Sequence, residues 1–166
     1  MSPIHERPPD LAHVAEAGDT LEQLWRANHE LELLSKRMIK TLGVTGPQRM
    51  VLRIVARRPG ISASGICEAA RIHASTLTGI LERLVHGGFI ERTRDSDDGR
   101  RARFDLTPAG ARIAEARRGT VESAVITSLS SLTPEERAVV RRWLSAFGDA
   151  LARERAELGE KEAKGS

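Results

Sequence analysis

The fold is decided by residues 61–108, which read ISASGICEAARIHASTLTGILERLVHGGFIERTRDSDDGRRARFDLTP. Ser62 is a favourable helix N-cap, so a first short helix is expected to begin there and to end near Ala70. A tight turn over residues 71–73 follows, and a second helix is predicted over residues 74–86. Two short helices joined by a three-residue turn are typical of a helix-turn-helix.

The second of these helices has one apolar side and one polar side. Its apolar residues recur at three- and four-residue spacing and form a stripe of Leu77, Ile80, Leu81 and Leu84. The other side chains face outward: Ser75, Thr76, Thr78, Gly79, Glu82 and Arg83. Gly87 and Gly88 are expected to end the helix, because glycine adopts the left-handed conformation that helix C-termini commonly need. Small hydrogen-bonding side chains are therefore expected at its exposed N-terminal end.

A β-hairpin is predicted directly after this helix. Residues 89–94 read as a strand, and residues 101–106 alternate apolar with polar side chains, as a second strand does. The loop between them is rich in turn formers, and its far side carries Arg100, Arg101 and Arg103. A helix-turn-helix followed by such a hairpin predicts a winged helix that binds double-stranded DNA. The second helix would enter the major groove, and a wing arginine would follow the phosphates or enter the minor groove.

Composition limits the classes of protein to which the chain can belong. Its 166 residues, 40% of them hydrophobic, suffice for one compact domain or for a small domain with helical extensions. The aromatic fraction of 3% argues against a binder of single-stranded nucleic acid, which stacks bases on aromatic rings. The net charge of +3, mostly from arginine, fits a focused DNA-binding patch.

No cofactor, metal site or membrane segment is expected. The single cysteine rules out an intramolecular disulfide framework and a cysteine-based zinc finger, and the five histidines lack metal-ligand spacing. The N-terminal residues do not resemble a signal peptide, and no apolar run approaches the ~18 residues of a membrane span. The sequence therefore predicts a soluble cytoplasmic protein.

Helical patterns flank the winged module on both sides. The expected organisation is a flexible arm (1–9), an N-terminal helix that contributes to dimerisation (10–44), the winged domain (45–107), C-terminal dimerisation helices (108–158) and a flexible tail (159–166). Capping boxes begin helices at residues 45–48 and 133–136, and a threonine and a proline begin another at residues 107–108. This last helix is expected to continue to about Leu132. Four arginines of the helix after Thr45 are interpreted as a solvated face, with phosphate contact or ion pairing as the alternative: Arg49, Arg53, Arg57 and Arg58.

The flanking helices carry more apolar surface than a small winged domain can bury. In a two-fold dimer with interleaved helices, the apolar sides of the flanking helices would pack against those of the second chain. The predicted dimerisation residues are Leu21, Leu24, Val140, Trp143, Leu144, Phe147 and Leu151. Such a dimer would place two recognition helices ~34–36 Å apart, which predicts a palindromic operator.

The order of these elements resembles the MarR family of bacterial winged-helix regulators over residues 21–151. The resemblance is carried by T-x-x-Q at 45–48, S-T-L-T at 75–78, E-R-L at 82–84, G-F-I-E-R at 88–92, D-x-x-D-x-R at 95–100 and L-T-P-x-G at 106–110. The family likeness implies a mostly α protein with a small β-hairpin wing: a winged helix-turn-helix between N- and C-terminal dimerisation helices. It also implies a homodimeric regulator, most often a repressor, whose DNA affinity changes with a small ligand or with thiol oxidation.

The resemblance also assigns roles to individual residues. The wing arginine is Arg100 with Asp98 as its acidic partner, and Gly79 departs from the family because an arginine often stands there. His73 or Arg83 is a candidate to compensate. The complete set of predicted DNA-binding residues is His73, Ser75, Thr76, Thr78, Arg83, Arg94, Asp98, Arg100 and Arg101. A family-type effector pocket would use Trp25 and His29 of the first helix and would be mostly aliphatic.

Two other functions remain open at the level of sequence. Cys67 is interpreted as a buried structural residue, and the alternative is a redox-sensing regulator that uses this thiol. A winged fold could also serve as a protein-interaction module. No nucleophile elbow, P-loop or zincin motif is present in the sequence, so an enzyme is not expected.

Overall fold

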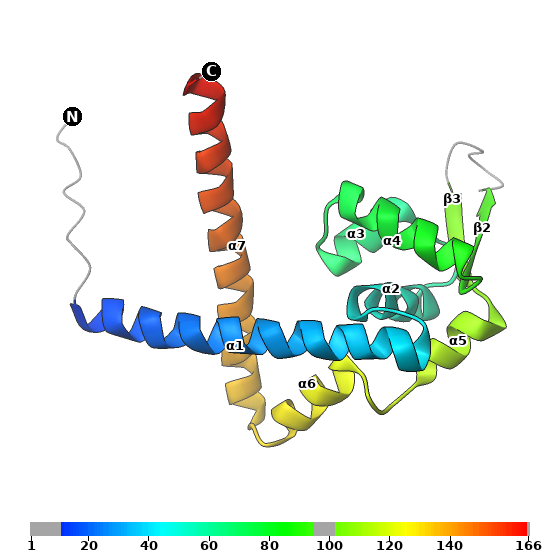
Figure 1. The fold of residues 1–166 in the computed structure, drawn as a ribbon, viewed down its shortest axis with the longest axis horizontal. Helices are drawn as coiled ribbons and strands as arrows, with labels where there is room; N and C mark the ends of the chain where they lie inside the picture. Colours follow the sequence, from blue (N-terminus) through cyan, green and yellow to red (C-terminus); the bar gives the residue numbers. More distant parts are fainter. Residues whose placement is uncertain (1–10, 95–101, 166) are drawn as a thin grey trace. The chain divides into compact units, whose positions relative to one another are not determined.

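The computed structural model describes residues 11–94 and 102–165 and shows a mostly helical chain with one small sheet (Figure 1). The elements are α1 (Leu11–Leu42), α2 (Gly46–Arg57), β1 (Ile61–Ser62), α3 (Ala63–Ala70), α4 (Ala74–His86), β2 (Ile90–Arg94), β3 (Ala102–Leu106), α5 (Pro108–Glu115), α6 (Val121–Ser130) and α7 (Pro134–Gly165). The expected fold class is confirmed. The chain divides into two compact units, Met1–Val121 and Glu122–Ser166.

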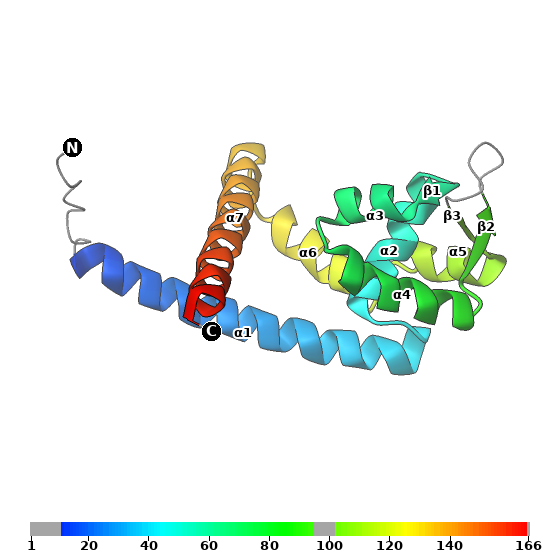
Figure 2. The same ribbon diagram turned by 90° about the horizontal axis from the view of Figure 1, so that it is seen from above.

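The core of the first unit lies where α2, α3, α4 and the sheet meet, an arrangement visible in Figure 2. Three residues of the predicted apolar stripe of α4 are buried, since Leu77, Leu81 and Leu84 are all at most 8% exposed, and the fourth, Ile80, is half-buried against the core. Its partners in the core are Val44, Val51, Leu52, Val55, Ile66, Ile90 and Phe104. Burial of this stripe leaves the opposite, polar side of α4 in solvent.

The C-terminal part of α1 joins this unit. Met38 is fully buried, and the Ser35 hydroxyl accepts a hydrogen bond of 2.9 Å from the backbone N–H of Gly46 at the start of α2. The helix runs without interruption through Gly18. Many apolar side chains of α1 remain exposed, among them Leu21, Trp25, Leu31, Leu33 and Ile39.

The sheet is antiparallel with the strand order β1-β3-β2. The hairpin of β2 and β3 was predicted, and its register pairs Ile90 with Leu106 and Arg94 with Ala102. The short strand β1 was not predicted, because Ile61–Ser62 is too short to show any periodicity and forms only by pairing with β3. The loop with Asp98, Arg100 and Arg101 lies outside the described residues.

Local capping explains where most helices begin. Thr45 and Gln48 form the predicted capping box on α2. The Thr45 backbone N–H donates to Gln48 Oε1 (N···O 2.8 Å), and the Gln48 backbone N–H donates to Thr45 Oγ1 (N···O 3.3 Å). Thr133 and Glu136 form the same device on α7. Ser62 caps α3 through the backbone N–H of Gly65, also as predicted. At the end of α4, Gly87 is right-handed (φ −74°), so the left-handed role falls to Gly88 alone (φ +68°).

The predicted continuous helix from residue 108 to about 132 is wrong, because α5 ends at Glu115 and α6 begins at Val121. The solvated interpretation of Arg49 is also wrong, since its side chain is fully buried. The Arg49 guanidinium donates hydrogen bonds of 3.2 Å to the carbonyl oxygens of Ile113 and Ala114, and another to that of Ala116. The last carbonyls of a helix commonly lack intrahelical partners, and here an arginine of α2 donates to them; the carbonyl oxygen of Ile113 also accepts from the backbone N–H of Ala116.

The second unit consists mainly of α6 and α7. The α7 helix continues to Gly165, beyond the expected end near Leu158. The rings of Trp143 and Phe147 stack with centroids 5.3 Å apart. No residue of α6 is fully buried. Within the described part of the chain, no helix is long and apolar enough to cross a membrane.

Candidate nucleic-acid interface

The exposed side of α4 gathers the polar residues that the sequence had singled out. His73 is the N-cap residue in an extended conformation (φ −71°, ψ 150°), and Ser75 and Thr76 follow on the first turn. All three side chains are exposed, as are Thr78 and Arg83. The Thr78 hydroxyl donates a hydrogen bond of 2.9 Å to the carbonyl oxygen of Ala74 in the preceding turn. The first turns of α4 therefore present hydroxyl and imidazole groups on a helix whose other side is fixed in the core.

Gly79 leaves a gap on the same helix. A Cβ atom built at this position would meet no heavy atom within 4 Å, so packing does not require a glycine here. The residues one turn before Gly79 are Ser75 and Thr76, and those one turn after it are Glu82 and Arg83.

The turn between α3 and α4 has an unusual backbone. Arg71 occupies the left-handed region (φ 53°, ψ 44°), and its backbone N–H donates to the carbonyl oxygens of Cys67 and Glu68. The Arg71 side chain is exposed. This residue was assigned only to a turn from the sequence, because nothing in a single sequence marks an arginine as left-handed.

The wing strands carry a row of exposed charged side chains. Arg92 and Arg94 of β2 are exposed, and so is Arg103 of β3. The Arg103 guanidinium donates a hydrogen bond of 3.0 Å to the carbonyl oxygen of Gly60. Arg94 pairs with Ala102, the last pair before the loop, so it lies at the base of the loop that contains the remaining predicted wing residues.

A hollow of about 470 Å³ separates α4 from the wing strands. Its lining includes the polar side chains of Thr78, Glu82 and Arg92 and the apolar side chains of Leu81 and Phe104. The two candidate DNA-contacting elements therefore flank a concave surface. The two elements of a winged helix contact different parts of the duplex, so a concave surface between them suits a convex partner such as a nucleic-acid strand.

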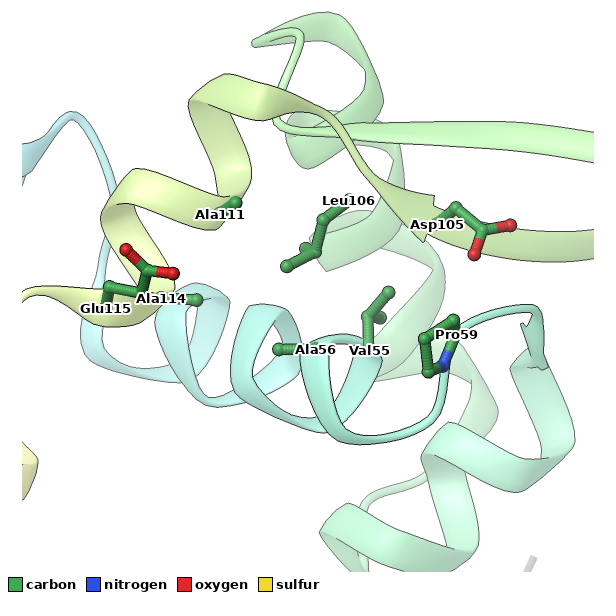
Figure 3. A pocket seen from close by; sticks show the side chains of 8 residues that line it. All are labelled: Val55, Ala56, Pro59, Asp105, Leu106, Ala111, Ala114 and Glu115. Carbon is green, nitrogen blue, oxygen red and sulfur yellow. The ribbon is translucent and has the colours of Figure 1, made fainter.

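A second cavity, of about 320 Å³, lies between α2, the end of β3 and α5 (Figure 3). Its walls are mostly aliphatic, with Val55, Leu106 and Ala111 among them, and the carboxylates of Asp105 and Glu115 also line it. Asp105 is held in place, because its Oδ1 accepts a hydrogen bond of 2.7 Å from the backbone N–H of Gly60. None of the residues predicted for DNA or effector binding lines this cavity.

The predicted effector residues are exposed on α1. The Trp25 side chain is 66% exposed, and His29 is exposed one turn later. Neither residue lines either of the two cavities. Their role in ligand binding stays a prediction.

The thiol of Cys67 is half-buried and packs against the core of the first unit. A structural role agrees with this packing, while a redox role stays a prediction. Within residues 11–94 and 102–165, no three histidine, cysteine or acidic side chains are grouped so that they could hold a metal ion.

The predicted dimerisation residues remain largely accessible in the single chain. Leu21 of α1 and Trp143, Leu144 and Leu151 of α7 are between 43% and 54% exposed. Leu24, Val140 and Phe147 are half-buried. Val125 and Ile126 of α6 are also exposed, although neither was among the predicted dimerisation residues.

Comparison with known proteins gives a consistent family. The MarR family model matches residues 42–101. The HTH-type transcriptional regulator YfiV of Bacillus subtilis is 32% identical over 113 residues, which cover 66% of this chain and 69% of YfiV. The HTH-type transcriptional repressor Rv2887 of Mycobacterium tuberculosis is 25% identical over 75% of this chain and 90% of its own length.

A solved structure extends the likeness to most of the chain. The PcaV transcriptional regulator of Streptomyces coelicolor, crystallised with its natural ligand, matches with a TM-score of 0.65 and 26% identity. The match covers 87% of this chain and 99% of PcaV. These similar proteins are named as regulators of transcription, which agrees with the expectation of a regulator rather than an enzyme.

Proposed function

The chain belongs to the MarR family of winged-helix transcriptional regulators, and from this premise we propose that it is a homodimeric repressor of a palindromic operator. A small-molecule effector would lower its affinity for that operator. Its site of action would be the cytoplasm, where a bacterial operator is accessible.

The observation that carries this proposal is the two-sided construction of α4. Leu77, Leu81 and Leu84 fix one side in the core, while Ser75 and Thr76 are exposed on the first turn of the other. An α-helix fits the major groove of B-DNA, and the N-terminal residues of a recognition helix contact base edges. A rigid helix with short polar side chains at that end can bring hydroxyl groups close to the bases.

The proposed contacts differ in kind along the interface. Ser75, Thr76 and Thr78 would hydrogen-bond to base edges or phosphates, with His73 and Arg83 at the margins. Arg94 would contact the backbone from the base of the wing. Asp98, Arg100 and Arg101 would form the tip of the wing, with Asp98 orienting Arg100. Phosphate contacts supply affinity and position the protein, while base contacts supply specificity.

The homodimer is supported by the apolar surface that each unit leaves exposed. Trp143, Leu144 and Leu151 lie on α7, and Leu21 and Trp25 lie on α1. Removing such apolar surface from water favours association. In a two-fold interface every residue contributes twice, which increases the apolar area that each such side chain buries.

The effector proposal draws on the ligand-bound relative PcaV. Trp25 and His29 are proposed to line the effector pocket in the dimer. The dimer would exist in two conformations, of which only one spaces its two recognition helices to match the operator. An effector that binds the other conformation more tightly increases the population of that conformation and so lowers the affinity for DNA.

The test is a fluorescence-anisotropy titration of the purified protein against a duplex that it has selected from a random-sequence library. We expect the selected duplex to be palindromic and to withstand competition from a scrambled duplex. The double variant Ser75→Ala, Thr76→Ala should bind the two duplexes almost equally, because it loses the contacts that read sequence. Equal wild-type affinity for both duplexes would overturn the proposal of sequence-specific repression.

A further inference from the structure

Two charged side chains of the wing strand β3 hold the residue that precedes β1. The backbone N–H of Gly60 donates a hydrogen bond of 2.7 Å to Asp105 Oδ1, and the carbonyl oxygen of Gly60 accepts one of 3.0 Å from Arg103 Nη1. The register of the sheet pairs Ile61 with Phe104, which places Gly60 opposite Asp105. These two bonds, named the Gly60 clamp, therefore extend the contact between β3 and the chain beyond the short strand β1.

The Gly60 clamp ties the wing to the start of the helix-turn-helix. Two residues after Gly60, Ser62 caps α3 through the backbone N–H of Gly65, and α3 packs against α4. Phe104, which lies between the two clamping residues of β3, is buried in the core that also holds α4. The core and the clamp therefore fix β3 relative to α4 at neighbouring positions of one strand.

The hairpin depends on such fixed points because most of it lies outside the core. In β2 the first residue, Ile90, is buried, while the four residues after it are exposed. A recognition helix enters the major groove while the wing follows the adjacent phosphates or the minor groove. Both sets of contacts form together only when the wing and the helix keep one relative position, since hydrogen bonds weaken steeply as distance and angle change.

We propose that Asp105 is a positioning residue, which together with Arg103 holds Gly60 and so sets the wing relative to α4 for binding one duplex. This inference rests on the proposed function, since it requires that α4 and the wing both contact DNA. Asp105 was not among the predicted DNA-binding residues, and a carboxylate repels phosphates. Its effect on DNA affinity would therefore act through the wing rather than through a contact of its own.

Two neutral variants of Asp105 separate the hydrogen bond from the charge. Asp105→Asn removes the charge but keeps an oxygen that can accept from Gly60, whereas Asp105→Val removes both. Valine is favoured in strands, and Asp105 borders a cavity with Val55 and Leu106 in its walls, so Asp105→Val is expected to fold. In anisotropy titrations, Asp105→Asn should bind the selected duplex at least as tightly as the wild type, and Asp105→Val about fivefold more weakly.

A double variant tests whether the lost affinity belongs to the wing. Arg94 is exposed on β2 and is proposed to contact the DNA backbone. If Asp105 acts by positioning the wing, the losses in log K of Asp105→Val and Arg94→Ala should be less than additive in the double variant. Losses that add in full would mean that Asp105 acts independently of the wing, and the proposal would be wrong.

The matched control is Glu91→Val, which removes an exposed carboxylate from the position opposite Asp105 on β2. It should not weaken binding, because β3 separates β2 from β1 and the clamp stays intact. If Asp105→Val binds as tightly as Asp105→Asn, the clamp does not position the wing. If circular dichroism shows Asp105→Val unfolded at the temperature of the titration, the bond serves folding and the proposal is equally wrong. A wild-type protein that binds neither the selected nor the scrambled duplex would instead refute the DNA-binding function on which the proposal rests.

Discussion

At the scale of single residues, Arg49 shows how one side chain holds two distant segments together. Its guanidinium is fully buried and donates to the carbonyl oxygens of Ile113, Ala114 and Ala116, which are 64 to 67 residues away in the chain. These bonds fix the end of α5 against the start of α2. They also supply a charged donor to carbonyl oxygens at the end of α5, where intrahelical donors run out.

Replacing Arg49 with methionine should therefore destabilise the protein strongly. The aliphatic part of the side chain is kept, but the carbonyl oxygens lose their donor, at a cost of about 2–4 kcal/mol. Urea unfolding followed by circular dichroism, at one fixed protein concentration, measures the loss. Arg57→Met is the control on the same helix, because Arg57 is exposed. If Arg49→Met unfolds at the same urea concentration as Arg57→Met, the hydrogen bonds of Arg49 contribute nothing to stability.

At the scale of elements, two glycines at helix positions should respond to alanine in opposite directions. Gly79→Ala in α4 should stabilise by about 0.5–1 kcal/mol, because alanine favours the helix and its Cβ would meet nothing within 4 Å. Gly110→Ala in α5 should destabilise by about 1–3 kcal/mol, because its Cβ would lie 1.9 Å from the carbonyl oxygen of Phe89. Thermal unfolding of the two variants beside the wild type checks both signs. If Gly79→Ala unfolds at a lower temperature than the wild type, the open space around residue 79 and the helix propensity of alanine do not determine stability at this position.

The helices and strands also show how much of the structure could be predicted from the sequence. The bounds of α3 and α4 were predictable because a serine cap and two glycines mark them locally. Strand β1 was not, because it exists only through pairing with Phe104 and Arg103, and two residues show no periodicity. The break between α5 and α6 was missed because apolar residues continue at helical spacing across it.

For the candidate site too, features that follow from a local pattern were predictable and features that depend on tertiary contacts were not. The exposure of Ser75, Thr76 and Thr78 follows from the apolar stripe on the opposite side of α4, so the sequence was sufficient to predict it. The left-handed conformation of Arg71 ends α3 through local backbone bonds that its residue type does not mark, whereas the burial of Arg49 depends on tertiary hydrogen bonds. No local pattern reports such bonds, and arginine is usually solvent-exposed.

At the scale of the whole molecule, the oligomeric state tests whether the exposed apolar residues of α7 form a dimer interface. The variant Leu144→Glu should convert a dimer into a monomer of 18.2 kDa, because a two-fold interface would receive two buried carboxylates. Sedimentation equilibrium measures the mass. The control Ala146→Glu lies two residues away on another side of α7, where the side chain is also exposed, and should remain a dimer.

Loss of the dimer should also change how the protein binds DNA. The core that supports α4 lies within Met1–Val121, so the monomer should keep a folded winged unit. Without its partner it can contact only one half of a palindrome, and tight binding to the full operator should be lost while a single half-site is bound as weakly as before. Anisotropy titrations of Leu144→Glu against the full operator and against one half-site measure this difference. If the variant stays dimeric, α7 does not form the interface. If the variant becomes monomeric and still binds the full operator tightly, recognition does not depend on the two copies of α4 in a dimer.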